Sequence, residues 1–223
     1  MRVSVFSYLS DLLTLSDEEA MLRVQRAGDR RAFTLLVRRW QGRIERLCGR
    51  LTGDVHRGED LAQEVFMRIY AHRTDYRHNG SFAAYARRIA LNACYDEHRR
   101  ARRIREIPLE QNSDRQDSFE ICLEAVEQSP DAVAANNERD ELIRKALFSL
   151  PESYRTVIIL RHYQRLRFRE IAEVMEIPLG TVKSRMAEGL ARLGRQLKTV
   201  LNDQQEISRG INETVKPTGK EMT

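Results

Sequence analysis

Hydrophobic residues recur every three or four positions along most of this chain, a spacing that predicts helices separated by short breaks. The clearest case lies between residues 168 and 195, where two such patterns follow one another. Pro178 interrupts them, because it fixes its own φ and disfavours helical geometry in Ile177. The inward positions that we expect are Ile171, Ala172 and Met175 in the first helix, then Val182, Met186, Leu190 and Leu193 in the second.

Two short helices around a corner of about three residues form a helix-turn-helix pattern, whose second helix enters the DNA major groove by its N-terminal end. The first turn of this helix presents small, hydroxyl and cationic residues, and no acid precedes Glu188. Those residues are Gly180, Thr181, Lys183, Ser184 and Arg185. Cations attract phosphate, so the pattern favours DNA binding over its alternative, an antiparallel helical hairpin with a solvated face.

Helices are also predicted before this pair. Ser16 and Glu19 form a capping-box signature that starts a helix ending near Ala27, and a longer apolar stripe that includes Trp40 follows. A helix from Glu59 to His72 comes next, and Ser81 is a good N-cap for a helix that ends near Arg103. The fold class is therefore all-α.

Two polar stripes on these helices suggest binding. Asp60, Gln63 and Glu64 lie away from the apolar positions of their helix, either as ordinary surface charge or as a docking patch for a basic partner. The second stripe combines cations, an amide and one aromatic: Arg88, Asn92, Tyr95, Arg99 and Arg102. Cations hold the phosphate backbone, while aromatic rings and amides can stack on or hydrogen-bond unpaired bases.

Charge divides the chain of 223 residues, whose formal net charge is +5. Residues 23–105 carry 20 Arg and 9 acids, residues 106–129 carry 1 Arg and 7 acids, and residues 130–201 carry 13 basic and 9 acidic groups. Two basic blocks around an acidic one indicate two nucleic-acid-facing modules on a linker. We expect two small helical domains at 16–105 and 130–201 and an acidic linker at 106–129. Residues 1–15 would be a flexible lead, and residues 202–223 a disordered tail.

Several other classes are disfavoured by the residues. The three cysteines, Cys48, Cys94 and Cys122, show no paired spacing and fit reduced thiols. We find no carboxylate cluster with metal-ligand spacing, no glycine-rich phosphate loop and no Ser/His/Asp arrangement, so we expect no metal, no cofactor and no enzyme activity. The opening residues lack a signal-peptide cleavage site, and no apolar run reaches the roughly 18 residues of a membrane span.

Four motifs, taken in order, resemble those of bacterial RNA polymerase sigma factors. They are EDLAQEVF at 59–66, GSF at 80–82 with IALN at 89–92 and Asp96, LPESYR at 150–155, and Ile171-Ala172 with GTVKSR at 180–185. The resemblance covers about residues 20–197 and is to the extracytoplasmic-function type, group four of the sigma-70 family, which has only regions two and four. Two departures are Tyr85, where the family usually has Trp, and Arg167-Phe168-Arg169 at the start of the helix-turn-helix.

The resemblance implies roles for individual residues. Asp60, Gln63, Glu64 and Phe66 match the segment that docks on the clamp helices of the largest polymerase subunit. Residues 76–82 match the loop that captures a flipped base of the −10 element, and the helix after it opens the strands. The −10 residues implied are Tyr76, Arg77, His78, Asn79, Ser81, Phe82, Tyr85, Arg88, Asn92 and Arg99. Thr181, Lys183, Ser184 and Arg185 match the helix that reads the −35 element.

The function expected from the resemblance is that of a cytoplasmic sigma factor, which binds core RNA polymerase and directs promoter-specific initiation. An anti-sigma factor would be a further partner. The alternative is a two-domain helix-turn-helix regulator that does not dock on polymerase, for which Asp60, Gln63 and Glu64 would have no partner. The promoter sequence and the inducing signal cannot be read from these residues.

Overall fold

The computed structural model describes residues 15–77, 80–106 and 141–214, and side chains within these ranges except at 104–106 and 199–214. Helices account for most of these residues and no strand occurs among them, which confirms the predicted all-α class. Nearly all of the predicted lead and of the acidic linker, together with two loop residues, His78 and Asn79, lie outside the described ranges.

The chain divides into two compact units. The first contains α2 to α5 together with residues 159–182, and the second contains the start of α7 and the chain from Lys183 onwards. Residues 141–148 are also helical. This grouping assigns residues 159–182 to the same unit as α2 to α5, so the boundaries 16–105 and 130–201 stay a prediction.

Helix α2 (Asp17–Ala27) begins with the predicted capping box. Ser16 Oγ accepts a hydrogen bond from Glu19 N, and Glu19 Oε2 accepts one from Ser16 N. The helix ends at Gly28, whose φ of 61° is in the left-handed region that glycine adopts without steric cost. Asp29 then caps helix α3 (Arg30–Thr52), so the two capping residues Gly28 and Asp29 are all that separates α2 from α3.

Helices α3 and α4 (Val55–Ala71) cross closely at a pair of glycines. A Cβ atom on Gly58 would lie 2.5 Å from Gly49 N and 2.6 Å from Gly49 Cα, so only hydrogen fits there. Helix α4 begins at Val55, four residues before the predicted start, because the Asp54 side chain accepts a hydrogen bond from Arg57 N. This crossing lets α4 bury Leu61, Val65 and Ile69 against its neighbours.

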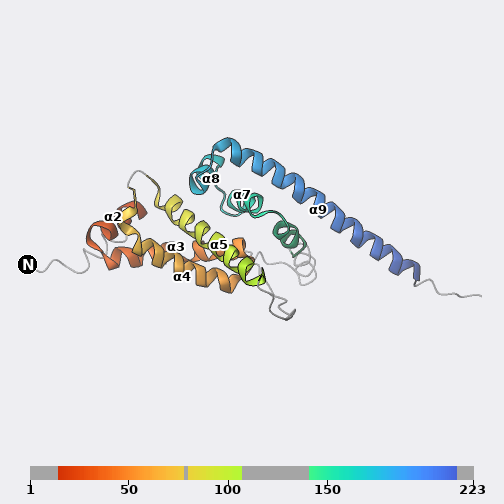
Figure 1. Cartoon of the computed structure of the whole chain (residues 1–223), viewed down its shortest axis with the longest axis horizontal. Helices are drawn as coiled ribbons and strands as arrows, with labels where there is room; N and C mark the ends of the chain where they lie inside the picture. Colours follow the sequence, from red (N-terminus) through yellow and green to blue (C-terminus); the bar gives the residue numbers. More distant parts are fainter. Residues whose placement is uncertain (1–14, 78–79, 107–140, 215–223) are drawn as a thin grey trace, which may run out of the picture. The chain divides into compact units, whose positions relative to one another are not determined.

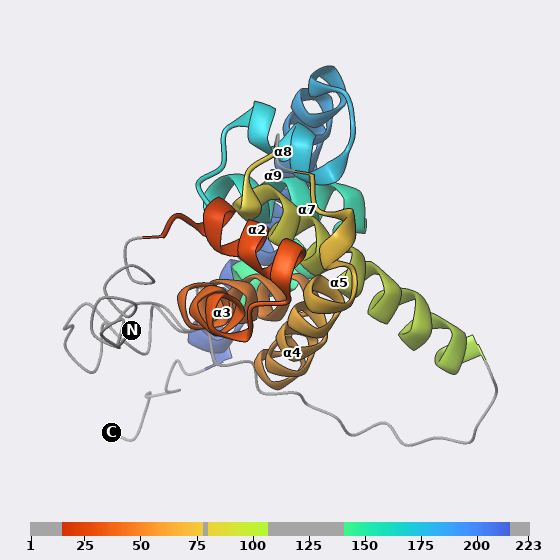
Figure 2. The ribbon, with the colours of Figure 1, turned by 90° about the vertical axis from the view of Figure 1, so that its left-hand side faces the viewer.

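Helix α5 (Phe82–Glu106) completes the first helical cluster. Figures 1 and 2 show α3, α4 and α5 packed side by side, with α2 across one end. Ser81 Oγ accepts a hydrogen bond from Ala83 N, which confirms the predicted N-cap. The core around α5 includes Trp40, whose ring packs edge-on against Phe82 with centroids 5.6 Å apart.

The C-terminal helices are α7 (Glu152–His162), α8 (Phe168–Met175) and α9 (Leu179–Thr214). Helix α8 ends where predicted, because Glu176 adopts a left-handed conformation (φ 52°) and Pro178 follows two residues later. Ile177 N donates a hydrogen bond to Ala172 O, which closes the last turn of α8. The two helices and their three-residue corner thus appear in the predicted order.

Two expectations about α9 are wrong. Leu190 is not inward, because Gly189 occupies the contact with α7: a Cβ there would lie 3.1 Å from Ile158 Cδ1, and Leu190 next to it is 43% exposed. The second error concerns the tail, since α9 continues to Thr214. Residues 202–214 contain no proline, and their Gln, Glu and Arg residues are compatible with helix, so nothing in the sequence ends the helix at Leu201.

Substitution of Gly58 tests the α3–α4 crossing. We expect Gly58→Ala to destabilise the first helical cluster by about 1–3 kcal/mol, because the added methyl group meets backbone atoms that cannot rotate away. The measurement is urea unfolding followed by the fluorescence of Trp40, the single tryptophan of the chain.

Gly42→Ala, in the middle of α3, is the matched control. Its methyl group would meet only Arg46 Nη1 at 3.3 Å, the far end of a flexible side chain, so the change should stabilise the helix by about 0.5–1 kcal/mol. Equal effects of the two substitutions would contradict the close crossing.

Candidate polymerase and nucleic-acid interface

The predicted docking residues lie on α4, whose opposite side packs in the core. Asp60 and Gln63 are exposed, and Glu64 is partly exposed, so the three share one accessible face as their spacing requires. Phe66 is different: it is only 7% exposed and packs with the core residues of α4. Its ring reaches the surface only at the floor of a shallow apolar hollow.

That hollow continues the polar face of α4 along the helix. It has a volume of about 390 Å³ and is lined by Phe33, Phe66, Met67, Tyr70 and Ala71. Met67 stands next to it with 65% of its surface exposed. The sequence reasoning missed this part of the surface, although Met67 follows Gln63 by four residues and Glu64 by three, the spacing that places side chains on one helix face.

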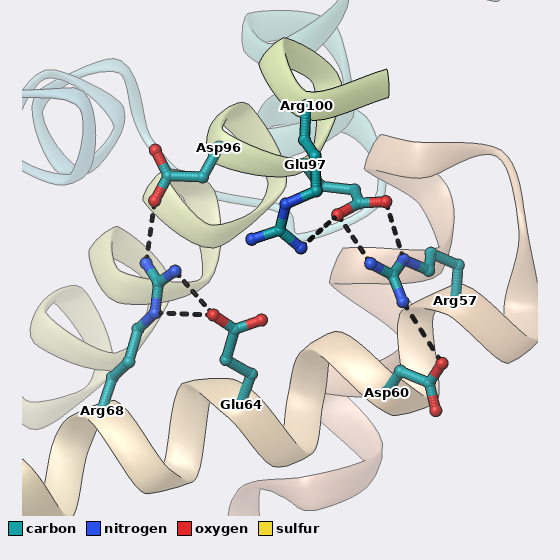
Figure 3. A network of polar contacts seen from close by, with 7 residues as sticks. All are labelled: Arg57, Asp60, Glu64, Arg68, Asp96, Glu97 and Arg100. Carbon is teal, nitrogen blue, oxygen red and sulfur yellow. Dashed lines mark hydrogen bonds and ion pairs between the residues drawn. The ribbon is translucent and has the colours of Figure 1, made fainter. Parts of the chain in front are cut away.

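Two arginines connect the docking carboxylates to α5 (Figure 3). Arg68 donates from Nε and Nη2 to Glu64 Oε1, at 3.1 and 2.7 Å, and from Nη1 to Asp96 Oδ2 at 3.0 Å. Arg57 holds both oxygens of Glu97, at 2.9 and 2.6 Å, and approaches Asp60 Oδ2 at 3.4 Å.

The network affects both arginines. Burial lowers the pKa of Arg68, but the hydrogen bonds that it donates to Glu64 and Asp96 outweigh that effect, so the pKa is raised overall. The hydrogen bond to Glu97 is the main reason that the pKa of Arg57 is raised. The sequence indicated Asp60 and Glu64 either as ordinary surface charge or as a docking patch. The arginines that bind them lie three and four residues away on α4. The α5 carboxylates that these arginines also bind are distant in sequence, and only the packing of α4 against α5 brings them close.

The loop after η1 (Arg73–Asp75), the start of α5 and two acids of α8, Glu173 and Glu176, line a cavity of about 540 Å³. Six of the predicted motif positions contribute to its lining: Tyr76, Arg77, Gly80, Ser81, Tyr85 and Arg88. Tyr85, which stands in place of the family's usual Trp, is partly exposed, and its ring lies 5.1 Å from that of Tyr76. The structure thus brings most of the predicted loop residues together around one concave site.

Two residues of α2 hold the backbone of this loop by hydrogen bonds. Gln25 Nε2 donates to Thr74 O and Tyr76 O, at 3.0 and 2.8 Å, and Glu18 Oε1 accepts from Phe82 N at 3.0 Å. No local pattern indicates these contacts, because Gln25 lies 49 and 51 residues from its partners and Glu18 lies 64 residues from Phe82. They fix the backbone on both sides of the cavity mouth.

Two predicted base-contacting residues are buried. Phe82 has no exposed surface, and Tyr76 is 4% exposed. Burial, followed by the nearby charge of Glu18, raises the pKa of Tyr76 to about 12, so its hydroxyl stays protonated and donates to Gly80 O at 3.2 Å. In this conformation Phe82 cannot stack on a base, because its ring packs against Trp40 as a support for the loop.

Along α5 the predicted DNA residues are accessible but not all free. Asn92 and Arg99 are exposed, and Arg99 Nη2 donates to Asp96 Oδ1 at 2.9 Å. Arg88 lies 5.9 Å from the Tyr85 ring centroid and donates from Nη1 to Glu176 Oε1, a residue of the same compact unit. These arginines therefore have carboxylate partners that DNA phosphates would have to replace.

The first turns of α9 carry the predicted recognition residues. Lys183 and Ser184 are exposed, and Thr181 and Arg185 are partly exposed. No side chain crowds Gly180, since a Cβ there would meet nothing within 4 Å. Glu188, the first acid of α9, accepts a hydrogen bond from Arg192 Nε at 2.7 Å, which also lowers the pKa of its carboxyl. The start of α9 therefore combines the positive end of the helix dipole with two cations, and no acid of α9 precedes Glu188.

Metal-ligand groups and membrane-spanning helices are both absent from the described part of the chain. Within it, no group of three or more His, Cys, Asp and Glu residues could hold a metal ion. No helix among the described residues is long and apolar enough to cross a membrane.

Two family models match the chain. The sigma-70 region 2 family matches residues 36–104, and the sigma-70 region 4 family matches residues 140–193. The first match contains the docking face, the loop and most of α5, while the second contains the helix-turn-helix. Each lies inside one of the two domains predicted from charge and pattern.

Curated relatives align over most of their length. The ECF RNA polymerase sigma factor SigW of Bacillus subtilis is 33% identical over 171 residues, which cover 77% of this chain and 91% of SigW. The RNA polymerase sigma-H factor of Pseudomonas aeruginosa is 32% identical over 189 residues, covering 84% of this chain and 96% of that protein. The sigma-E factor of Escherichia coli K12 is 33% identical over 77% of this chain and 89% of its own length.

Solved structures share the fold at lower identity. CnrH, in complex with the cytosolic domain of CnrY, is 22% identical and has a TM-score of 0.58, covering 82% of this chain and 97% of CnrH. The sigma factor RpoE of Bartonella quintana is 20% identical with a TM-score of 0.54, covering 74% and 96%. The family matches and the identities to curated relatives together show that this chain belongs to the extracytoplasmic-function sigma factors of the sigma-70 family, which direct promoter-specific initiation of transcription.

Proposed function

We propose that this sigma factor docks on the clamp helices of the largest polymerase subunit through Asp60, Gln63 and Glu64, with Phe66 at the edge of the contact. The observation that supports this most is the accessible surface of α4. Its acids stand on an accessible face beside an apolar hollow, while its other side is fixed in the core. A basic partner helix with an apolar side chain would satisfy both parts of this surface.

The −10 element would be bound by the cavity and by α5. Flipping a base out of a duplex costs a few kcal/mol, and stacking returns about 1–3 kcal/mol per base. Tyr85 offers a partly exposed ring at the cavity wall, and Arg77 and Arg88 line the same space. Asn92 and Arg99 would contact the opened strand further along α5. Tyr76 and Phe82 would act by supporting the loop, since both are buried.

The −35 element would be read by Thr181, Lys183, Ser184 and Arg185. Each well-formed bidentate contact to a base is worth about 1–3 kcal/mol of discrimination, and contacts to phosphate add affinity without sequence preference. We assign region two to residues 16–105 and region four to residues 130–201, and the two family matches within these ranges support the assignment. The contribution of the acidic linker at 106–129 stays a prediction.

Partners and location follow from this role. Bacterial polymerase works in the cytoplasm, so we place this chain there, acting by binding and not by catalysis. An anti-sigma factor is a further partner that we propose, because the RpoE structure of similar fold was solved with the anti-sigma factor NepR. The alternative, a regulator without polymerase contact, has no specific observation in its favour, and it leaves the exposed face of α4 unexplained.

Charge reversal at Asp60 tests the docking surface. Asp60 is two-thirds exposed and pairs only loosely with Arg57, so Asp60→Lys should leave the fold intact. We expect binding to core polymerase to weaken at least about tenfold, because a like charge facing a basic partner costs on the order of several kcal/mol. The measurement is titration of labelled core polymerase at fixed salt.

Glu45→Lys on α3 is the matched control, since it makes the same change of charge on a different helix and should leave affinity near that of the wild type. Run-off transcription with a promoter library then reports activity and the −35 and −10 preferences together. A wild-type chain that binds core polymerase but supports no specific transcript would reject the proposed function.

Removal of the cations at the start of α9 tests the −35 surface. We expect Lys183→Ala and Arg185→Ala each to reduce the slope of log affinity against log salt by about 1, because each lost phosphate contact releases one fewer counterion. The holoenzyme would be titrated with duplex DNA that carries the selected −35 element. Lys198→Ala, an exposed cation further along α9, should leave the slope unchanged, and an equal loss for all three variants would contradict the assignment.

A further inference from the structure

The proposed docking face of α4 and the cations of α5 are joined by two separate sets of ion pairs. Their members are the seven residues of Figure 3, Arg57, Asp60, Glu64, Arg68, Asp96, Glu97 and Arg100, together with Arg99. Figure 3 shows Arg57 and Arg68 lying between the carboxylates of α4 and those of α5. In each set of ion pairs, one arginine of α4 and one arginine of α5 bind the same carboxylate of α5.

The two halves of this network differ in how the arginine of α4 distributes its donor groups between the carboxylates of α4 and α5. Arg57 gives Nε and Nη2 to the two oxygens of Glu97, the bidentate arrangement that is strongest, and keeps only a 3.4 Å contact with Asp60. Arg68 does the reverse. It directs Nε and Nη2 to Glu64, on the docking face, and only Nη1 to Asp96. Arg68 is therefore the member that a change at the docking face would redirect.

The two carboxylate oxygens of Asp96 bind different arginines. Oδ2 accepts from Arg68 Nη1 at 3.0 Å, and Oδ1 accepts from Arg99 Nη2 at 2.9 Å. Arg99 is 71% exposed and reaches solvent on α5, where the proposed function places single-stranded DNA. A second donor from Arg68 to Asp96 would compete directly with Arg99 for the same carboxylate.

We propose that Arg68 is a positioning residue that couples the docking face to DNA: when a basic partner takes Glu64, Arg68 turns from Glu64 to Asp96, and Arg99 is released to bind phosphate. This inference rests on the proposed function for the identity of the two partners. The coupling works equally in the other direction, because linkage is reciprocal, so a chain whose Arg99 is held by DNA has Arg68 nearer Asp96 and Glu64 more available to polymerase.

The expected coupling is small. Ion pairs at this exposure are worth about 0.2–1 kcal/mol each, which corresponds to a change of about 1.4-fold to fivefold in affinity. A coupling of about twofold to threefold is therefore the size to look for, and the experiment has to separate it from the general gain in DNA affinity on loss of any negative charge.

The test measures binding of the full-length chain, without polymerase, to a fluorescein-labelled single strand of mixed sequence at low salt. Glu64→Gln imitates the docked state, because it removes the charge that attracts Arg68 on α4 and leaves Asp96 as the charged carboxylate bound to that arginine. Glu59→Gln is the matched control: Glu59 lies on the same helix, carries the same charge, pairs with His56 and is outside the network. We expect Glu64→Gln to tighten binding about twofold to threefold more than Glu59→Gln.

Arg99→Gln tests whether the additional tightening of DNA binding by Glu64→Gln depends on Arg99. In that background the two glutamine substitutions should have equal effects, because the residue that would be released is absent. Arg68→Lys should also abolish the excess, since an ammonium cannot reproduce the fork that bridges both carboxylates. A purely structural role of Glu64 would instead lower the thermal midpoint and DNA affinity together.

Two results overturn the proposal. One is an equal effect of Glu64→Gln and Glu59→Gln in the wild-type background, and the other is an excess that persists with Arg99→Gln. Because the test uses neither polymerase nor a promoter, its failure leaves the proposed function standing. Failure of the chain to bind core polymerase would reject that function and leave the measured coupling as a property of the free chain.

Discussion

The close crossing of α3 and α4 is the constraint on which the proposed polymerase-docking surface depends. Gly58 brings the α4 backbone against Gly49, and the apolar residues of α4 are buried as a result. A helix fixed on one side in this way has only one face left for a partner. Asp60 and Glu64 are on that face and connect to α5 through arginines, so the proposed docking and DNA-binding surfaces lie on the same pair of packed helices.

The loop that we propose binds the −10 element relies on a different kind of support. Its backbone is tied to α2 by Gln25 and Glu18, and its aromatic interior is packed against Trp40. The consequence is a cavity whose wall is preformed, with Tyr85 and Arg88 at its surface. A site that is already shaped loses less entropy when a base enters, which helps a small protein to offset the cost of unstacking.

Local features were predictable from the sequence and long-range ones were not. The capping box at Ser16, the cap at Ser81 and the corner before Pro178 each depend on residues within one turn, and all three were confirmed. Asp60 and Glu64 are bound by Arg57 and Arg68, which lie within about one turn of them on α4. The other carboxylates that these arginines bind, Glu97 and Asp96, lie on α5, so no pattern within α4 could reveal that connection. Leu190 was wrongly placed because helical spacing alone does not show that Gly189 forms the contact with α7.

The central claim, that the exposed face of α4 meets the largest polymerase subunit, is tested most directly by site-specific crosslinking. A photoreactive phenylalanine analogue at position 63 lies in the middle of that face, and one at position 45, on α3, serves for comparison. We predict that position 63 crosslinks to the clamp helices of the largest subunit in the assembled holoenzyme and that position 45 does not. A holoenzyme that is active in transcription yet gives no crosslink from position 63, or a crosslink only to another subunit, would contradict the claim.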